Sequence, residues 1–156
     1  MKKFSCLLIA VLLIIISGCT NNQTTKTKAT KQTTVSRQME IKINDTTLEA
    51  TLENNSSADA FIALLEDAPL TLTMSDYANM EKNANLDLSL PENNEYLNTQ
   101  AGDIILYQGK TLVIYYDRNS WNLTPLGKIN NIDAKSLKEL LGTGDVTVTF
   151  SLKQNK

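Results

Sequence analysis

Residues 69–82, PLTLTMSDYANMEK, form the stretch that decides the fold of this chain. Its first half alternates leucine and methionine with threonine and serine, a period of two that is typical of a β-strand with one buried face. The strand pattern runs directly into an acidic and aromatic turn at Asp76-Tyr77, which is followed by Glu81-Lys82. The sequence before this stretch is typical of targeting and lead-in segments, whereas most of the sequence after it predicts further strands.

The first 18 residues have the pattern of a bacterial lipoprotein signal peptide. Two lysines precede an apolar run over residues 4–16, which is too short to span a bilayer comfortably. Residues 16–19, Ile-Ser-Gly-Cys, then resemble a lipobox, whose cysteine receives a diacylglycerol and a further acyl chain such as palmitate. We predict that Cys19 is lipidated and attaches the protein to the cell membrane, with the domain outside the cytoplasm. An uncleaved membrane anchor is the alternative.

The next segment, residues 19–38, is rich in threonine, lysine, asparagine and glutamine and has almost no apolar residues after its first cysteine. Such a sequence buries too little apolar surface to offset the entropy of ordering it, so we predict a disordered tether. The predicted organisation is therefore a signal peptide over residues 1–18, a lipidated cysteine and tether over 19–38, and a single domain over 39–156.

Composition excludes several classes of function. The chain has no histidine, and its two cysteines, Cys6 and Cys19, both precede the domain, which excludes histidine-dependent triads, thiolate nucleophiles and cysteine- or histidine-ligated metals. All 17 acidic residues lie in the domain but only nine of the 15 basic residues do, so the domain has a net charge of 9 − 17 = −8. A domain this acidic repels phosphate backbones, and we predict no nucleic-acid partner.

The domain pattern predicts about eight strands and two short helices. Strands are expected over residues 39–43, 48–52, 70–75, 85–90, 104–107, 112–116, 126–129 and 145–152. Helices are expected over residues 56–67, capped by Ser56, and 133–141, capped by Asp133 and stopped by Gly142. Residues 91–100 and 117–126 are predicted to be loops. The hairpin over residues 103–116 is apolar on both faces, so both faces must be covered. These elements indicate a mainly antiparallel closed barrel or a sandwich.

Several motifs along the domain together resemble a known family. They are the strand-helix-strand run 47–72, Thr73-Met74-Ser75-Asp76-Tyr77, Glu81-Lys82, Leu90-Pro91, Gly102-Asp103-Ile104, Ile114-Tyr115-Tyr116 and Leu126-Gly127-Lys128-Ile129. Their order and spacing over residues 39–152 resemble the bacterial cyclophilin-like domain family. The resemblance implies a mainly β fold, a closed eight-stranded antiparallel barrel with two short helices that cap its ends.

The resemblance does not carry over a catalytic activity. True cyclophilins, which are peptidyl-prolyl isomerases, place an arginine beside a pocket of phenylalanine, glutamine and other aromatic residues. This chain has no Phe-His-Arg and no Gln-Gly-Gly run, and Arg118 is the only arginine after residue 38. Fold similarity alone is a weak reason to assign a function.

The organising stretch supplies the first candidate site. Tyr77, Glu81 and Lys82, together with Asp76, could line a cleft at a barrel mouth, with Asp76 and Glu81 as an acid–base pair. The structural alternative, which we favour from the sequence, is that Asp76 caps a turn, Tyr77 packs on the barrel and Glu81-Lys82 is a solvated or paired surface.

A second candidate site groups Arg118 with Tyr115, Tyr116 and Trp121. A planar guanidinium beside flat aromatic rings suits a peptide or a sugar. The alternative is that one tyrosine belongs to the core, the other is half-exposed and Trp121 closes one end of the barrel.

No metal or cofactor is predicted. The polar residues that alternate over residues 83–89 imitate a calcium loop, but Leu88 occupies the position that needs glycine and Asn94 the position that needs glutamate. The predicted function is a membrane-anchored module that binds a peptide or small ligand without catalysis. A weak peptidyl-prolyl isomerase for exported proteins is the alternative, and an accessory subunit that docks through the 104–116 hairpin is a third hypothesis.

Overall fold

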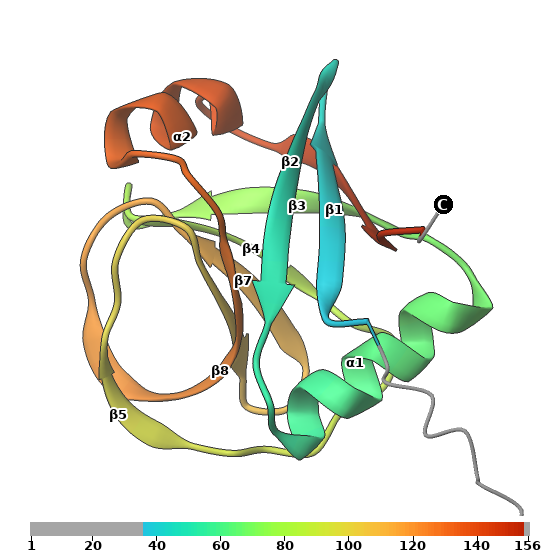
Figure 1. The fold of residues 1–156 in the computed structure, drawn as a ribbon. Coiled ribbons are helices and arrows are strands. Elements are labelled where there is room, and N and C mark those ends of the chain that lie inside the picture. Colours follow the sequence, from blue (N-terminus) through green and yellow to red (C-terminus); the bar gives the residue numbers. More distant parts are fainter. Residues whose placement is uncertain (1–35, 155–156) are drawn as a thin grey trace, which may run out of the picture. The chain divides into compact units, whose positions relative to one another are not determined.

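The computed structural model describes residues 36–154, so the predicted signal peptide, Cys19 and residues 20–35 of the tether lie outside the described residues. The described part has nine strands and two helices (Figure 1). They are β1 (Gln38–Ile43), β2 (Thr46–Leu52), α1 (Ser56–Asp67), β3 (Leu70–Tyr77), β4 (Glu81–Asn85), β5 (Glu95–Asn98), β6 (Asp103–Tyr107), β7 (Thr111–Tyr115), β8 (Ser120–Ile129), α2 (Ala134–Leu141) and β9 (Val146–Leu152).

Eight of the strands close into a barrel. Their order is β2-β1-β9-β3-β4-β7-β6-β8, every neighbouring pair is antiparallel, and β8 pairs again with β2. At this closing seam a side chain on Gly127 would place its Cβ 2.6 Å from the carbonyl oxygen of Thr51, so only glycine lets the two backbones approach. The prediction of a closed eight-stranded antiparallel barrel is confirmed.

The ninth strand lies outside the closed barrel. β5 pairs only with the first residues of β8, from Ser120 to Leu123, whereas the later residues of β8 pair with β6 and β2. β8 is thus a long strand whose first part leaves the barrel and forms a two-stranded ribbon with β5, visible on the left of Figure 1. This ribbon is the feature that creates the site described below.

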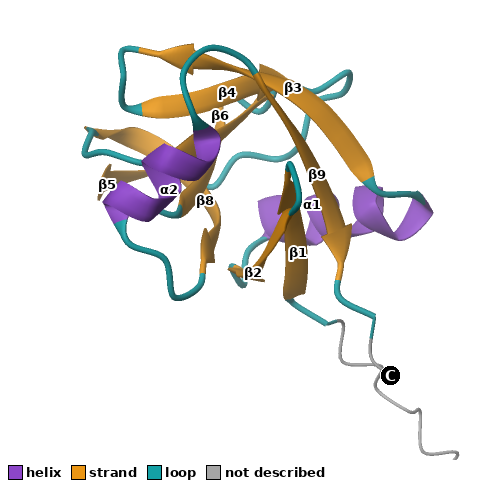
Figure 2. Ribbon diagram, turned by 90° about the horizontal axis from the view of Figure 1, so that it is seen from above, coloured by secondary structure: helices purple, strands orange, loops and turns teal. Residues whose placement is uncertain are grey.

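The two helices lie on opposite sides of the barrel (Figures 1 and 2), as the prediction of two capping helices requires. α1 buries Phe61, whose ring meets the ring of Phe150 edge-on at a centroid distance of 6.2 Å. α2 buries Leu137 and Leu141 in the same core. Asp133 caps α2 as predicted, but α1 is capped by Asn55, one residue before the predicted Ser56.

The barrel core follows the predicted alternation. Each core strand turns one set of apolar side chains inward, as in Val146, Val148 and Phe150 of β9. The 103–116 hairpin turns at Gln108 and Gly109, which both have positive φ. Its apolar residues are buried on both faces.

Three predicted segments are wrong. The leucines of residues 85–90 alternate, but β4 ends at Asn85 and residues 86–90 form a loop. Leu86 and Leu90 of this loop are buried, and their backbone N–H groups donate to the β6–β7 turn. The predicted loop 91–100 contains β5, and the predicted loop 117–126 contains more than half of β8. Pro125 and the polar residues of β8 have low strand propensity, so the sequence does not predict a strand there. The strand forms because β8 pairs with β5, β6 and β2.

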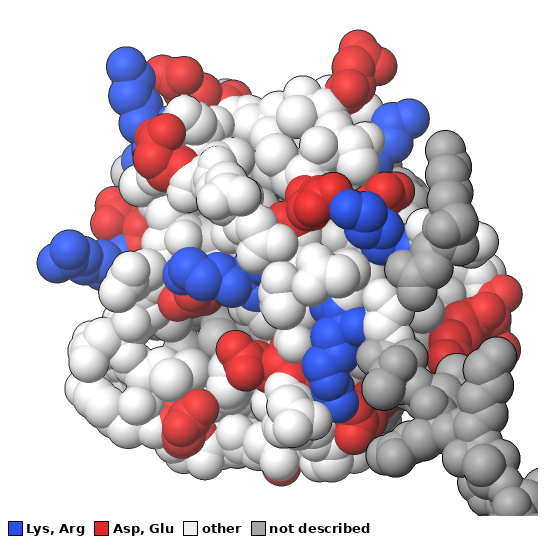
Figure 3. Space-filling view, viewed as in Figure 1, with Lys and Arg blue, Asp and Glu red and all other residues white. Residues whose placement is uncertain are grey.

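Neither helix of residues 36–154 is long and apolar enough to cross a bilayer. On the face of the molecule seen in Figure 3, basic side chains are scattered among acidic ones and form no continuous basic patch.

Candidate functional site

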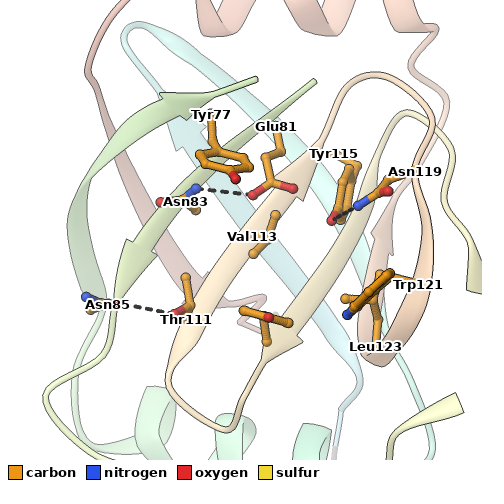
Figure 4. A pocket seen from close by; sticks show the side chains of 11 residues that line it. Tyr77, Glu81, Asn83, Asn85, Thr111, Val113, Tyr115, Asn119, Trp121 and Leu123 are labelled. Carbon is orange, nitrogen blue, oxygen red and sulfur yellow. Dashed lines mark hydrogen bonds between the residues drawn. The ribbon is translucent and has the colours of Figure 1, made fainter. Parts of the chain in front are cut away.

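A pocket of about 460 Å³ lies on the outer face of the barrel, between the sheet and the β5–β8 ribbon (Figure 4). Strands β3, β4, β6, β7 and β8 and the segment between β7 and β8 supply its walls. It is lined by Tyr77, Glu81, Asn83, Asn85, Tyr107, Thr111, Val113, Tyr115, Asn119, Trp121 and Leu123.

Strand geometry places these side chains together. Successive residues of a strand point to opposite faces, so Glu81, Asn83 and Asn85 of β4 face outward while Lys82 faces the barrel. β4 pairs with β7, in register Glu81 to Tyr115 and Asn83 to Val113. The outward residues of the two strands therefore form one continuous surface.

The floor of the pocket is apolar and buried. Ile105, Val113, Tyr115 and Leu123 form a second hydrophobic cluster, separate from the barrel core, against which Leu97 of β5 packs. The ribbon thus covers the outer apolar face of the β6–β7 hairpin, and the expectation that both faces of this hairpin are covered is confirmed. Because the ribbon covers only part of the face, a hollow remains beside it.

Polar side chains around the pocket hold one another in place. The Asn83 amide donates to Glu81 Oε1 (3.1 Å), and the Thr111 hydroxyl donates to Asn85 Oδ1 (2.9 Å). The Asn119 amide donates to the Tyr115 hydroxyl oxygen (3.0 Å). The bond between Thr111 and Asn85 ties β7 to β4, and all three bonds, drawn in Figure 4, orient the groups that a ligand would meet.

Glu81 is the charged residue of this pocket, and it is 8% exposed. Among the described residues, no lysine or arginine forms a salt bridge with it. Burial raises the pKa of the neighbouring Tyr115 hydroxyl, and the Glu81 carboxylate raises it further, against the opposing effect of the Asn119 hydrogen bond. Tyr115 is therefore a neutral phenol at physiological pH.

The barrel-facing side of the β3–β4 hairpin carries a separate polar cluster. Lys82 is fully buried, and its ammonium donates to Asp76 Oδ2 (2.9 Å) and to the carbonyl oxygen of Gly144 (2.6 Å). The Tyr116 hydroxyl donates to the same Asp76 oxygen (2.8 Å), and the ammonium of Lys138 lies 5.2 Å from the centre of the Tyr116 ring. The cluster joins β3, β4 and the end of β7 to α2 and the turn before β9.

The cluster shifts two pKa values. The Lys82 ammonium, and then the Tyr116 hydroxyl, donate to the Asp76 carboxylate and hold its pKa below the usual range. Burial, followed by the negative charge of Asp76, raises the pKa of Tyr116. Asp76 therefore stays a carboxylate and Tyr116 a neutral phenol at neutral pH, and the hydrogen bonds among the three side chains make the cluster a satisfied structural unit.

The structure separates the predicted site residues into three places. Tyr77, Glu81, Tyr115 and Trp121 line the outer pocket, although the sequence hypotheses assigned them to two different sites. Lys82 and Tyr116 lie in the barrel-facing cluster, where Lys82 is paired with Asp76. Of the alternative that Glu81-Lys82 is a solvated or paired surface, the structure therefore shows the pairing of Lys82, whereas both residues are buried and neither is solvated.

Arg118 is exposed in the turn before β8 and is not among the residues that line the pocket. The Asp76 carboxylate accepts a hydrogen bond from the backbone N–H of Asn79 (3.2 Å), as expected of a residue that caps a turn. It stands opposite Lys82 in the β3–β4 pairing, whereas Glu81 stands opposite Tyr77. The two carboxylates therefore face opposite sides of the hairpin and cannot work as an acid–base pair.

Sequence reasoning missed the polar and apolar residues between the predicted ones. They are Asn83, Asn85, Tyr107, Thr111, Val113, Asn119 and Leu123. The spacing of two along β4 and β7 would have found those on these strands, once residues 81–85 were recognised as a strand. Asn119 and Leu123 gave no such signal, because their segment was predicted to be a loop.

Within residues 36–154, no group of three or more histidine, cysteine, aspartate or glutamate side chains is placed to hold a metal ion.

Comparisons with known proteins place the domain among others of similar fold. A model of the cyclophilin-like family matches residues 41–151. The chain is similar to a hypothetical protein from Archaeoglobus fulgidus, solved in solution, with a TM-score of 0.55 and 16% identity over 76% of this chain and 96% of that protein.

The chain is also similar to McbB, solved in complex with tryptophan, with a TM-score of 0.54 and 15% identity over 76% of this chain. It spans 46% of the McbB chain. At these identities the likeness concerns the fold alone. A search of curated proteins finds no match.

Proposed function

The chain belongs to the cyclophilin-like family, and from this premise we propose that its outer-face pocket binds a peptide or a small ligand without catalysing a reaction on it. The observation that carries the proposal is the pocket itself. It combines an apolar floor with exposed aromatic side chains, Tyr77 at 62% and Trp121 at 59% exposure, and with oriented amides. Concave apolar surfaces with a few convergent polar groups are the usual form of a ligand site.

The charges around the pocket favour binding over prolyl isomerisation. Isomerisation would need a cation near the prolyl nitrogen or carbonyl group and an apolar pocket for the ring. Among the described residues, none of those that line the pocket is a lysine or an arginine. Lys82 is buried on the opposite face of β4, and Arg118 lies outside the lining. The apolar pocket is thus present without the cation.

We test the binding role by NMR titration of the isotope-labelled full chain with an Ala-Pro peptide. The chain has one tryptophan, so the single indole signal reports directly on Trp121 in the pocket. We expect shifts of this signal and of the Val113 amide, and no acceleration of the exchange between the cis and trans forms of the peptide, which takes tens of seconds or longer when uncatalysed.

Replacement of the pocket tryptophan gives the matching variant. We expect Trp121→Ala to weaken binding about tenfold, as is typical of an aromatic anchor, with the Val113 amide as reporter. Tyr96→Ala is the control, because Tyr96 is 71% exposed on β5 and does not line the pocket. Accelerated exchange that disappears in Arg118→Ala would instead make the protein an isomerase. Absence of any shift with the peptide would remove prolyl peptides as ligands.

We also propose that the domain is held outside the cytoplasm by a lipid anchor on Cys19. The support is the lipobox-like sequence over residues 16–19 and the threonine- and lysine-rich segment that follows it. We expect a labelled fatty acid fed to cells to be incorporated into the wild-type protein and not into Cys19→Ala. Equal labelling of the two proteins would contradict the anchor, and Cys6→Ala is the matched control.

A further inference from the structure

We infer that the ligand of the outer pocket carries an organic cation, an ammonium or guanidinium group that binds between the Glu81 carboxylate and the surrounding aromatic rings. This inference rests on the proposed binding function, because it names the chemical class of the group that enters the same pocket. It is independent of the identity of the rest of the ligand.

The first argument is the burial of Glu81. Its side chain retains only 8% exposure, and carboxylates are seldom buried this far unless they are paired. The groups of the described chain that hydrogen-bond to Glu81 are neutral, the side-chain amide of Asn83 and the hydroxyl of Tyr115, and no described lysine or arginine forms a salt bridge with it. A cationic ligand would supply the missing countercharge at this buried carboxylate.

The other buried charge of the β3–β4 hairpin, on Lys82, differs from Glu81 in having a charged partner, and this contrast supports the argument. Lys82, the next residue in the chain, is fully buried and has both an acidic partner and a carbonyl acceptor. The fold therefore pairs the charge on the barrel side of β4 and leaves the charge on the pocket side unpaired. That carboxylate opens toward the hollow that Figure 4 shows.

The second argument is the aromatic lining. Tyr77, Tyr107, Tyr115 and Trp121 all line the pocket, and they belong to four different strands. Tyr77 stands directly opposite Glu81 on β3, and Tyr115 stands opposite it on β7, so the carboxylate has an aromatic residue on each neighbouring strand. The faces of such rings attract cations, most strongly at desolvated sites, and indole is the best of them.

The third argument is the absence of any feature that would hold an anion. The lining contains no lysine or arginine, and the domain carries a net charge of −8, which lowers the local concentration of anions and raises that of cations. Neutral apolar groups can also bind on the apolar floor of the pocket. The inference is therefore tested by the difference in affinity between a cationic ligand and a neutral ligand of similar shape.

The experiment compares a probe that carries an ammonium group with a matched probe that lacks it, and adds a second cation of different structure. The full chain, isotope-labelled, is titrated with the amide of Nα-acetyl-lysine, with the amide of Nα-acetyl-norleucine, which has a similar side chain without the ammonium group, and with choline. The indole signal of Trp121 and the Val113 amide report binding. We expect the lysine probe to bind at least tenfold more tightly than the norleucine probe. Shifts with choline as well would indicate that free amines, and not only peptide side chains, are accepted.

Two variants assign the preference to the pocket. Glu81→Gln keeps the shape of the side chain and an acceptor for Asn83, and we expect it to reduce the preference for the lysine probe at least tenfold. Glu139→Gln removes the same charge from an exposed position on α2 and should leave the preference unchanged. Trp121→Leu, at an exposed position, should weaken the binding of the lysine probe more than the binding of the norleucine probe. This variant tests the inference even if Glu81→Gln fails to fold.

The outcomes separate this inference from the binding function itself. If the neutral probe binds as tightly as the lysine probe, or if Glu81→Gln keeps the full preference, the cation is excluded while the pocket remains a binding site. If none of the probes shifts the pocket signals while an Ala-Pro peptide does, the cation is again excluded and the binding function stands. If neither the probes nor the peptide shift them, both proposals fail.

Discussion

Replacement of Lys82 by alanine should cost about 2–5 kcal/mol of unfolding free energy, because it leaves a cavity where a fully buried side chain stood and removes the cationic partner of the partly exposed Asp76 carboxylate. The Lys82 side chain is fully buried, and its ammonium joins the carboxylate of Asp76 to the carbonyl of Gly144. Truncation would remove the ammonium donor from both acceptors, and Asp76 would keep only the Tyr116 hydroxyl and the backbone N–H of Asn79. Chemical denaturation with urea, followed by circular dichroism, measures the loss.

Lys82→Met separates the charge from the volume. Methionine fills most of the space of the lysine chain, and Asp76, whose side chain is 28% exposed, can still be hydrated. We therefore expect Lys82→Met to be clearly more stable than Lys82→Ala. Lys135→Ala, which changes an exposed lysine with a loose partner on α2, is the control and should cost less than about 1 kcal/mol. If Lys82→Ala also lowered the unfolding free energy by less than about 1 kcal/mol, the Lys82 cluster would stabilise the fold no more than an exposed ion pair does.

The second large effect is a dependence of stability on pH through Asp76. Its pKa in the folded protein is lowered by the hydrogen bonds from Lys82 and Tyr116, relative to about 3.9 in an unfolded chain. The stabilisation from this group is thus complete above the unfolded pKa and is lost as the pH falls from there through the folded pKa. Asp76→Asn removes the charge, and we expect it to cost about 1.5–3 kcal/mol at pH 7, as is typical of hydrogen bonds to a charged group.

The difference between wild type and Asp76→Asn should therefore narrow as the pH is lowered below about 4. Urea unfolding of both proteins at a series of pH values between neutrality and the acid transition measures this difference. Asp87→Asn, at an exposed position of the loop after β4, serves as the control and should follow the wild type. A gap of constant size at every pH would show that the carboxylate of Asp76 is not the titrating group.

Most of the barrel could be predicted because its strands have one buried face. The alternation in residues 39–52, 70–75 and 145–152 identifies strands that the structure contains, and the helix over residues 56–67 follows from its apolar stripe and the proline after it. The family resemblance adds the closure of the sheet, which no local pattern encodes, since the seam depends on a close contact between Gly127 and Thr51, 76 residues apart in sequence.

The candidate pocket could be predicted only in part, because it lies where local patterns are misleading. Residues 120–125 include asparagine, threonine and proline and look like a loop, yet they form the strand that carries Trp121 and Leu123. Residues 86–90 look like a strand, yet no strand is beside them to pair with. The predicted strand began at residue 85, whereas β4 begins at residue 81, and this difference hid the alternation that sends Glu81 outward and Lys82 inward. That ligands bind in the pocket remains a prediction.

The pairing of β1 with β9 has a consequence for the order in which the molecule acquires its structure. Met39, near the start of the domain, stands opposite Leu152, near its end, and β9 is also the strand that links β1 to β3. Until β9 has been synthesised, the β1–β2 hairpin has no partner on its open edge and the barrel cannot close. Such distant pairing is typical of slow folding. A nascent chain that stops before residue 146 would thus expose strand edges that can recruit other chains, so the synthesis of β9 determines whether the domain folds or aggregates.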